Sequence, residues 1–166
     1  MVEGARELRE RLKPFGLESF VNTTGDKGLH VVAPIAPEAD WDTVKNVTKD
    51  LAAAMERDNP QAYLATSVKK ARTGRIYVDY LRNSRGATAV AAYSTRARPR
   101  APVSTPLAWD ELSPDMKPNS YTVSNLPARL EQLRDDPWTD LFQIKQTLPS
   151  AVRARAKRKT TCANRA

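Results

Sequence analysis

The segment Arg75–Arg82, with the sequence RIYVDYLR, places an acidic side chain in the middle of a predicted β-strand. Residues 76–81 alternate between two faces and are rich in β-branched and aromatic side chains, as a buried strand is. Asp79 interrupts one of these faces. A lone buried carboxylate costs several kcal/mol unless cations or hydrogen bonds compensate it. We therefore expect a cationic partner for Asp79, either a metal ion or an arginine such as Arg82. An ordinary ion pair at a strand end is the simpler alternative.

The rest of the pattern predicts an α+β domain with one mainly antiparallel sheet and flanking helices. Helices are expected over residues 2–13, from Asp40 or Asp42 through Met55, over 127–133 behind Asn125, and from 136–138 toward Pro149. Strands are expected over residues 20–23, 29–35, 75–82, 87–93 and 121–123, and residues 63–68 fit either a strand or a loop. No internal repeat is present.

The net charge of +8 is concentrated at the C-terminus. Residues 151–166 carry six arginines and lysines and no acid, which leaves +2 for residues 1–150. We expect residues 150–166 to form a disordered basic tail that binds polyanions, nucleic acid first. Its candidate DNA contacts are Lys157, Arg158 and Lys159. A solvated terminus without a role is the alternative.

Composition also excludes several classes of protein. No apolar run approaches the roughly 20 residues that span a membrane. The first sixteen residues mix acids and bases without an apolar core, unlike a secretory signal. Cys162 is the only cysteine, so neither a disulfide framework nor a cysteine zinc site is expected. These features fit a reducing cytoplasm.

The segment TTGDKGLH, residues 23–30, has the composition of an anion-binding turn between two strands. Backbone N–H groups near Gly25 and Gly28 can point toward an oxyanion, and Lys27 supplies charge. The GxxxxGK[ST] spacing of a P-loop is absent, and a plain hairpin turn fits equally well. His30 is the only histidine, and a structural role is its simpler interpretation.

A second group of basic residues surrounds Asp79. The run from Lys69 to Arg75 is expected to be a solvated loop. Residues 94–108 are expected to be extended and rigid, with three prolines and the arginines Arg96, Arg98 and Arg100. The guanidinium fork binds phosphate in a bidentate way, so one carboxylate among several arginines favours a metal–phosphate site. No Ser-His-Asp triad, zinc site or dinucleotide fingerprint is present.

In chain order, the segments TGDKGLHVVAPI, KARTGRIYVDYLRNSRGATAVAAYSTRARPRAPVSTPLAWDEL and DPW resemble the polymerase domain of bacterial DNA ligase D. The likeness covers about residues 3–149. This family belongs to the archaeo-eukaryotic primase superfamily, so the resemblance implies the RRM-like half of a primase-polymerase fold. It also implies a DNA-repair nucleotidyltransferase that fills gaps and extends DNA ends in bacterial non-homologous end joining. The implied cofactors are two Mn²⁺ or Mg²⁺ ions. The implied partners are DNA ends, ribonucleoside or deoxyribonucleoside triphosphates, ligase D and Ku proteins.

The resemblance assigns roles to particular residues. Asp79 matches the third metal-binding aspartate of the family, and Arg82 and Arg96 match arginines that position the nucleotide or the carboxylates. Thr24 and His30 match a hydroxyl and a histidine that bind nucleotide phosphates, with Lys27 and Gly28 in the same turn. Arg98 and Arg100 are candidate DNA contacts. Asp26 departs from the pattern, because it replaces a small residue and adds negative charge beside the phosphate site.

The largest departure is a missing pair of acids. The family carries an Asp-x-Asp pair before the glycine-rich turn, whereas this sequence offers only glutamates there: Glu3, Glu7, Glu10 and Glu18. We therefore expect residues 1–149 to be a partial domain without its N-terminal half. Since one carboxylate cannot hold two divalent ions, we expect no polymerisation by this chain alone. A separate N-terminal half-domain would complete the site. A non-catalytic module that binds nucleotide or DNA, and a truncated remnant, are the alternatives.

Overall fold

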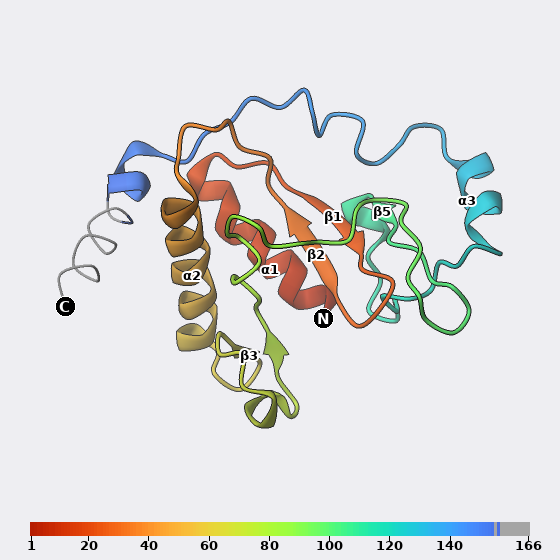
Figure 1. Ribbon diagram of the computed structural model, residues 1–166, viewed down its shortest axis with the longest axis horizontal. Coiled ribbons are helices and arrows are strands. Elements are labelled where there is room, and N and C mark those ends of the chain that lie inside the picture. The colour runs from red at the N-terminus through yellow and green to blue at the C-terminus, as the bar shows by residue number, and fades with distance from the viewer. Residues whose placement is uncertain (155, 157–166) are drawn as a thin grey trace. The chain divides into compact units, whose positions relative to one another are not determined.

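The computed structural model describes residues 1–154 and 156. It divides into two compact units (Figure 1). The first unit combines Met1–Pro34 with Val90–Gln146, and the second combines Ile35–Ala89 with the chain from Thr147 onward. Helices and a three-stranded antiparallel sheet make the fold α+β, as predicted. No helix in the described ranges is long and apolar enough to cross a membrane.

The first unit is built on the antiparallel sheet β2-β1-β5. Its strands are β1 (Phe20–Thr23), β2 (Leu29–Val32) and β5 (Pro106–Leu107), and its helices are α1 (Val2–Leu12) and α3 (Leu126–Gln132). Thr23 lies opposite Leu29, so the β1–β2 turn is residues 24–28. Helix α1 packs its small and apolar residues against this sheet, and Val2, Ala5, Val21, Leu107 and Leu112 form the core.

Most predicted elements of the first unit are confirmed with small shifts. Helix α1 and strand β1 match their predicted ranges, whereas β2 ends three residues early. The prediction of a strand at 121–123 is wrong, because only an isolated bridge joins Thr122 to Pro102. Asn125 precedes α3, but its side chain accepts from the N–H of Thr122, 2.6 Å away, and does not cap the helix.

The last predicted helix, from residues 136–138 toward Pro149, is wrong. Residues 138–143 are turns and residues 144–149 have no regular structure. Asp136 Oδ1 accepts from the N–H of Trp138 at 2.7 Å, which closes a local turn. Trp138 then donates from Nε1 to the carbonyl of Val21 at 3.1 Å, and Gln146 bonds the backbone of Glu18 and Pro34. The side chains of this segment thus bond to the backbone of other segments, whereas a helix would pair its own backbone N–H and carbonyl groups.

The second unit is built around α2 (Trp41–Asp58) and the short parallel pair β3 (Tyr63–Leu64) and β4 (Ile76–Tyr77). Asp40 caps α2, because its Oδ1 accepts from the N–H of Thr43 at 2.7 Å. Val47, Ala52 and Met55 form the buried side of the helix, which packs against β3. Residues 150–154 are helical, and Arg153 pairs with Glu38 at 2.8 Å.

Two predicted strands in this region are wrong. The strand expected over 75–82 is reduced to Ile76–Tyr77, because its parallel partner β3 is equally short. The ladder ends where the N–H of Val78 donates to the carbonyl of Leu64 at 2.9 Å. Residues 87–93 contain turns and irregular chain and no strand. Their small side chains offer little apolar area, so burial contributes little to ordering them as a strand.

Candidate functional site

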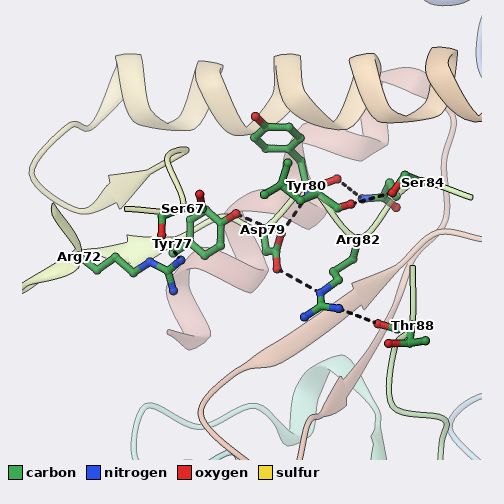
Figure 2. A network of polar contacts seen from close by, with 10 residues as sticks. Ser67, Arg72, Tyr77, Asp79, Tyr80, Arg82, Ser84 and Thr88 are labelled. Carbon is green, nitrogen blue, oxygen red and sulfur yellow. Dashed lines mark hydrogen bonds and ion pairs between the residues drawn. The ribbon is translucent and has the colours of Figure 1, made fainter. Parts of the chain in front are cut away.

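Asp79 lies just beyond the end of β4, with 40% of its side chain exposed (Figure 2). Its Oδ1 accepts from the N–H of Leu81 at 3.0 Å and from the hydroxyl of Tyr77 at 3.2 Å. Its Oδ2 is 3.8 Å from Nε of Arg82. The prediction that this carboxylate is buried in a strand is therefore wrong. The cationic partner of Asp79 in the structure is Arg82. This contact is the ordinary ion pair at a strand end that we gave as the simpler alternative.

The Asp79 carboxylate opens onto a cavity of about 420 Å³. The cavity is lined by Ser67, Arg72, Tyr77, Asp79, Leu81, Arg82 and Ala87. Two arginines and one aspartate give the cavity a net positive lining. This charge favours an anionic ligand, either alone or bound together with a cation. Figure 2 shows Arg72 beside Tyr77, and Arg82 between Asp79 and Thr88. Arg82 donates from Nη1 to the carbonyl of Thr88 at 3.4 Å.

Arg72 also lines this cavity. Its sequence context did not identify it as a site residue, because the basic run that contains it is typical of a solvated loop. Its guanidinium carbon lies 4.1 Å from the centre of the Tyr77 ring, and its Nη2 donates to the carbonyl of Ser67 at 2.6 Å. Its buried Nε finds no acceptor among the residues that the structure describes. An unsatisfied buried donor beside a cavity suits an anionic ligand. The available signal was the basic run immediately before the Asp79 segment.

Tyr77 holds the carboxylate of Asp79 in a fixed orientation. Burial, followed by the charge and the hydrogen bond of Asp79, raises the pKa of Tyr77 to about 12. The phenol therefore keeps its proton at neutral pH and donates to Asp79. With Leu81 also donating, Oδ1 of Asp79 is occupied, and Oδ2 is the oxygen directed to Arg82.

The glycine turn, residues Thr24–Gly28, joins β1 to β2 in the first unit. Thr24 Oγ1 donates to the carbonyl of Gly28 at 2.9 Å and accepts from the N–H groups of Asp26 and Gly28 at 3.3 and 3.2 Å. These N–H groups are therefore directed to the Thr24 hydroxyl. Lys27 is exposed on the turn, and His30 lies on β2 opposite Asn22.

Arg96 lies directly against the glycine turn. Gly25 has a φ of +67°, and a Cβ at this position would lie 2.8 Å from Cγ of Arg96. The prediction that residues 94–108 are extended throughout is wrong, because the chain folds back as a hairpin in which the N–H of Arg96 donates to the carbonyl of Pro102 at 2.8 Å. Arg98 reaches back to the turn, with its Nη2 3.3 Å from Oδ2 of Asp26. Arg100 lies at the hairpin tip with a φ of +69°.

The structure thus groups the predicted residues within each unit. The glycine turn meets Arg96 and Arg98 in the first unit, and Asp79 meets Arg82 in the second. Lys157, Arg158 and Lys159 lie outside the described residues. No cluster of three or more His, Cys, Asp or Glu side chains suited to a metal ion occurs within residues 1–154 and 156. The exposed Asp79 carboxylate is the kind of hard oxygen ligand that Mg²⁺ and Mn²⁺ prefer, but it supplies only one ligand group.

Comparison with known proteins gives the family. The model of the LigD primase-polymerase domain matches residues 1–138. The chain belongs to this family. It is 40% identical over 154 residues to the multifunctional non-homologous end joining protein LigD of Pseudomonas aeruginosa, covering 92% of the chain and 18% of that relative. It is 29% identical over 161 residues to the bifunctional LigD of Bacillus subtilis, covering 96% of the chain and 26% of that relative.

A solved structure shares the fold. The polymerase domain of Mycobacterium tuberculosis ligase D, in complex with DNA, matches with a TM-score of 0.75 and 30% identity. The match covers 81% of this chain and 46% of that domain. The chain therefore spans about half of the polymerase domain and about a fifth to a quarter of the curated LigD relatives.

Proposed function

We propose that this chain supplies part of a nucleotidyl-transfer site that fills gaps and extends DNA ends in non-homologous end joining. The observation that carries the proposal is Asp79, presented between Arg72 and Arg82 on the rim of one cavity in a member of the LigD primase-polymerase family. The names of the LigD relatives support the repair pathway, and the DNA-bound neighbour supports DNA as a partner. Nucleoside triphosphates, Ku proteins and a cytoplasmic location follow from the same proposal.

Each cluster has a distinct task in this proposal. Asp79 binds Mg²⁺ or Mn²⁺, which would supply Lewis-acid stabilisation of charge on the phosphate oxygens. Tyr77 orients the carboxylate, and Arg72 and Arg82 bind phosphate oxygens through their guanidinium forks. In this way the protein binds and positions its ligand, and little covalent chemistry is required of its side chains.

The glycine turn and its arginines have the second task. Lys27, His30 and Arg96 hold the triphosphate, and the internal bonds of Thr24 and Gly28 keep the turn in shape. Arg98 and Arg100, with Lys157, Arg158 and Lys159 of the C-terminal segment, contact the DNA backbone. Such phosphate contacts give affinity without sequence preference, which suits a protein acting on broken ends of any sequence.

A single carboxylate does not suffice for a two-metal reaction. We propose that the further acidic ligands come from the N-terminal half of such a polymerase domain, on the same or another polypeptide. The net positive lining of the Asp79 cavity also supports a second candidate function, a module that binds nucleotide or DNA without catalysis. The two candidates differ in whether supplying the missing ligands produces activity.

The deciding experiment measures Mn²⁺-dependent nucleotide addition to a primer–template with a 5′ overhang. The purified chain is assayed alone and with the N-terminal half of the Pseudomonas aeruginosa polymerase domain. We expect no addition by the chain alone and addition by the mixture. Asp79→Asn should abolish addition, whereas Asp58→Asn, which removes an exposed acid from the end of α2, should retain it.

Three other outcomes are informative. Addition by the chain alone would show that it contains all the carboxylates the reaction needs. A soluble complex of the two halves that adds no nucleotide, yet still binds triphosphate, would favour the binding module. Equal activity of the parent and Asp79→Asn complexes would remove Asp79 from the metal site.

A further inference from the structure

We propose that Asp26 is a built-in competitor for phosphate at the glycine turn, and that a phosphate ligand must displace it from Arg98. This inference rests on the proposed function, because it concerns the turn assigned there to the triphosphate. It goes beyond that function by giving Arg98, assigned there to the DNA backbone, a further phosphate ligand at the turn, whose affinity Asp26 lowers. The supporting observation is the ion pair between Asp26 and Arg98, which are 72 positions apart in sequence.

The contacts around Asp26 show what it occupies. Its Oδ2 is 3.3 Å from Nη2 of Arg98, and the two side chains are 31% and 58% exposed. The neighbouring Gly25 lies against Arg96, so the turn and the arginine hairpin are packed together at this point. A carboxylate and a phosphate offer the same pair of oxygen acceptors to a guanidinium fork. Asp26 therefore stands where a phosphate oxygen would bind.

The charges around the turn explain why the competition matters. Lys27, Arg96, Arg98 and Arg100 supply four cations on the two packed loops, and Asp26 is the one acid among residues 24–28 and 96–100. The carboxylate neutralises one guanidinium and repels an incoming polyphosphate. Because an exposed ion pair is weak, a ligand with several negative charges can displace it.

Most backbone donors of the turn are already bonded within the protein. The N–H groups of Asp26 and Gly28 are bonded to Thr24 Oγ1, and the N–H of Gly25 donates to the carbonyl of Pro118 at 2.9 Å. A phosphate at this turn therefore depends on side-chain cations more than on backbone amides. Arg98 is the cation paired with Asp26. Removing the Asp26 carboxylate should therefore raise the affinity of the turn for phosphate.

The test titrates inorganic tripolyphosphate, without metal, into the intact chain and measures affinity by calorimetry. Asp26→Asn and Asp26→Ser should bind about fivefold more tightly than the parent, from loss of the competing pair and of one repulsive charge. The matched control is Glu10→Gln, which removes an exposed acid paired with Lys13 in the same unit. It should change affinity less than about twofold, because its charge is remote and screened. Arg98→Ala should reduce the gain given by Asp26→Asn to the smaller part that comes from losing a repulsive charge, because the contested cation is then absent.

The outcomes separate this inference from the proposed function. Equal affinity of parent and Asp26 variants, or an equal gain from Glu10→Gln, would refute the competitor. An undiminished gain in the Arg98→Ala background would refute Arg98 as the contested group. Absence of tripolyphosphate binding in every variant would refute an anion site at the turn. A gain specific to Asp26 would stand even if the polymerase assay failed, because this readout requires no catalysis.

Discussion

Replacing Gly25 by alanine tests the packing of the glycine turn against Arg96. Gly25 has a φ of +67°, where an L residue costs roughly 1–2 kcal/mol. The added Cβ would lie 2.8 Å from Cγ of Arg96 and 3.3 Å from backbone atoms of Pro102 and Val103. The arginine side chain can move, but the backbone atoms yield less, so crowding adds about 1 kcal/mol. We expect a total destabilisation of about 2–3 kcal/mol.

The chain provides a matched control for the backbone cost. Gly16 has a φ of +68°, and a Cβ there would have nothing within 4 Å. Gly16→Ala should therefore carry only the conformational cost, about 1 kcal/mol after the gain from a less flexible unfolded chain. Gly28, which has no positive φ and open space around it, should tolerate alanine with little effect.

The assay is urea denaturation followed by tryptophan fluorescence, with thermal melting as a second readout. For a chain of this size, about 2–3 kcal/mol corresponds to a fall in Tm of roughly 4–12 °C. Adding Arg96→Ala to Gly25→Ala should recover part of the loss, because the closest contact is removed. Equal destabilisation by Gly25→Ala and Gly16→Ala would refute the contact between the turn and Arg96.

Two further predictions concern ionisable groups. The pKa of Tyr77 rises from 10 to about 12 in the folded chain, so its contribution to folding stability should be constant below pH 10 and be lost as the pH rises toward 12; Tyr77→Phe should flatten that fall in urea titrations at several pH values. Arg129 forms an ion pair with Glu111 and stacks on Tyr121 at 4.9 Å, and truncating it strands a partly buried carboxylate. Arg129→Ala should therefore cost about 2 kcal/mol at pH 7. Burial acts to raise the pKa of Glu111, but the hydrogen bond from Arg129 leads the effects that lower it overall, so the cost should shrink as acid protonates Glu111; a cost that does not change with pH would refute the pair.

Sequence patterns located the elements whose signals are local. Helix α2 follows from its apolar spacing and from an aspartate that caps it, and the structure selects Asp40 over Asp42 as the cap. Strand β1 and helix α1 follow from equally clear patterns. Each of these elements carries its own apolar face and its own start or stop residue, so local sequence suffices.

The failed predictions depend on partners that a local pattern does not reveal. The alternation across residues 75–82 resembles a long strand, but β4 ends where its partner β3 ends. The bonds of Asp79 to Leu81 and Tyr77 then turn the chain. Residues 138–149 have helical spacing, yet Trp138 is bonded to the backbone of Val21, more than one hundred positions away. Tertiary contacts therefore determine the backbone conformation of both segments.

The candidate site shows the same contrast between residues that a local sequence pattern identifies and residues whose contacts depend on the fold. Asp79 and Arg82 belong to one short motif, whereas the importance of Arg72 depends on the fold of the loop that stacks it on Tyr77. The contact of Arg98 with Asp26 was equally invisible, because the two residues meet only when the hairpin folds back onto the turn.

The local origin of the Asp79 geometry bears on whether a separate half-domain could restore activity. The contacts that orient this carboxylate come from Tyr77, Leu81 and Arg82, all within three positions. Its direct hydrogen-bond and ion-pair partners therefore all belong to this motif. A preorganised ligand loses less entropy when its metal and partner carboxylates arrive. Complementation should thus be limited by association of the halves, and raising the concentration of the added half should saturate activity along one binding curve. Activity that stayed absent after saturation would show that Asp79 is not correctly placed by its own motif.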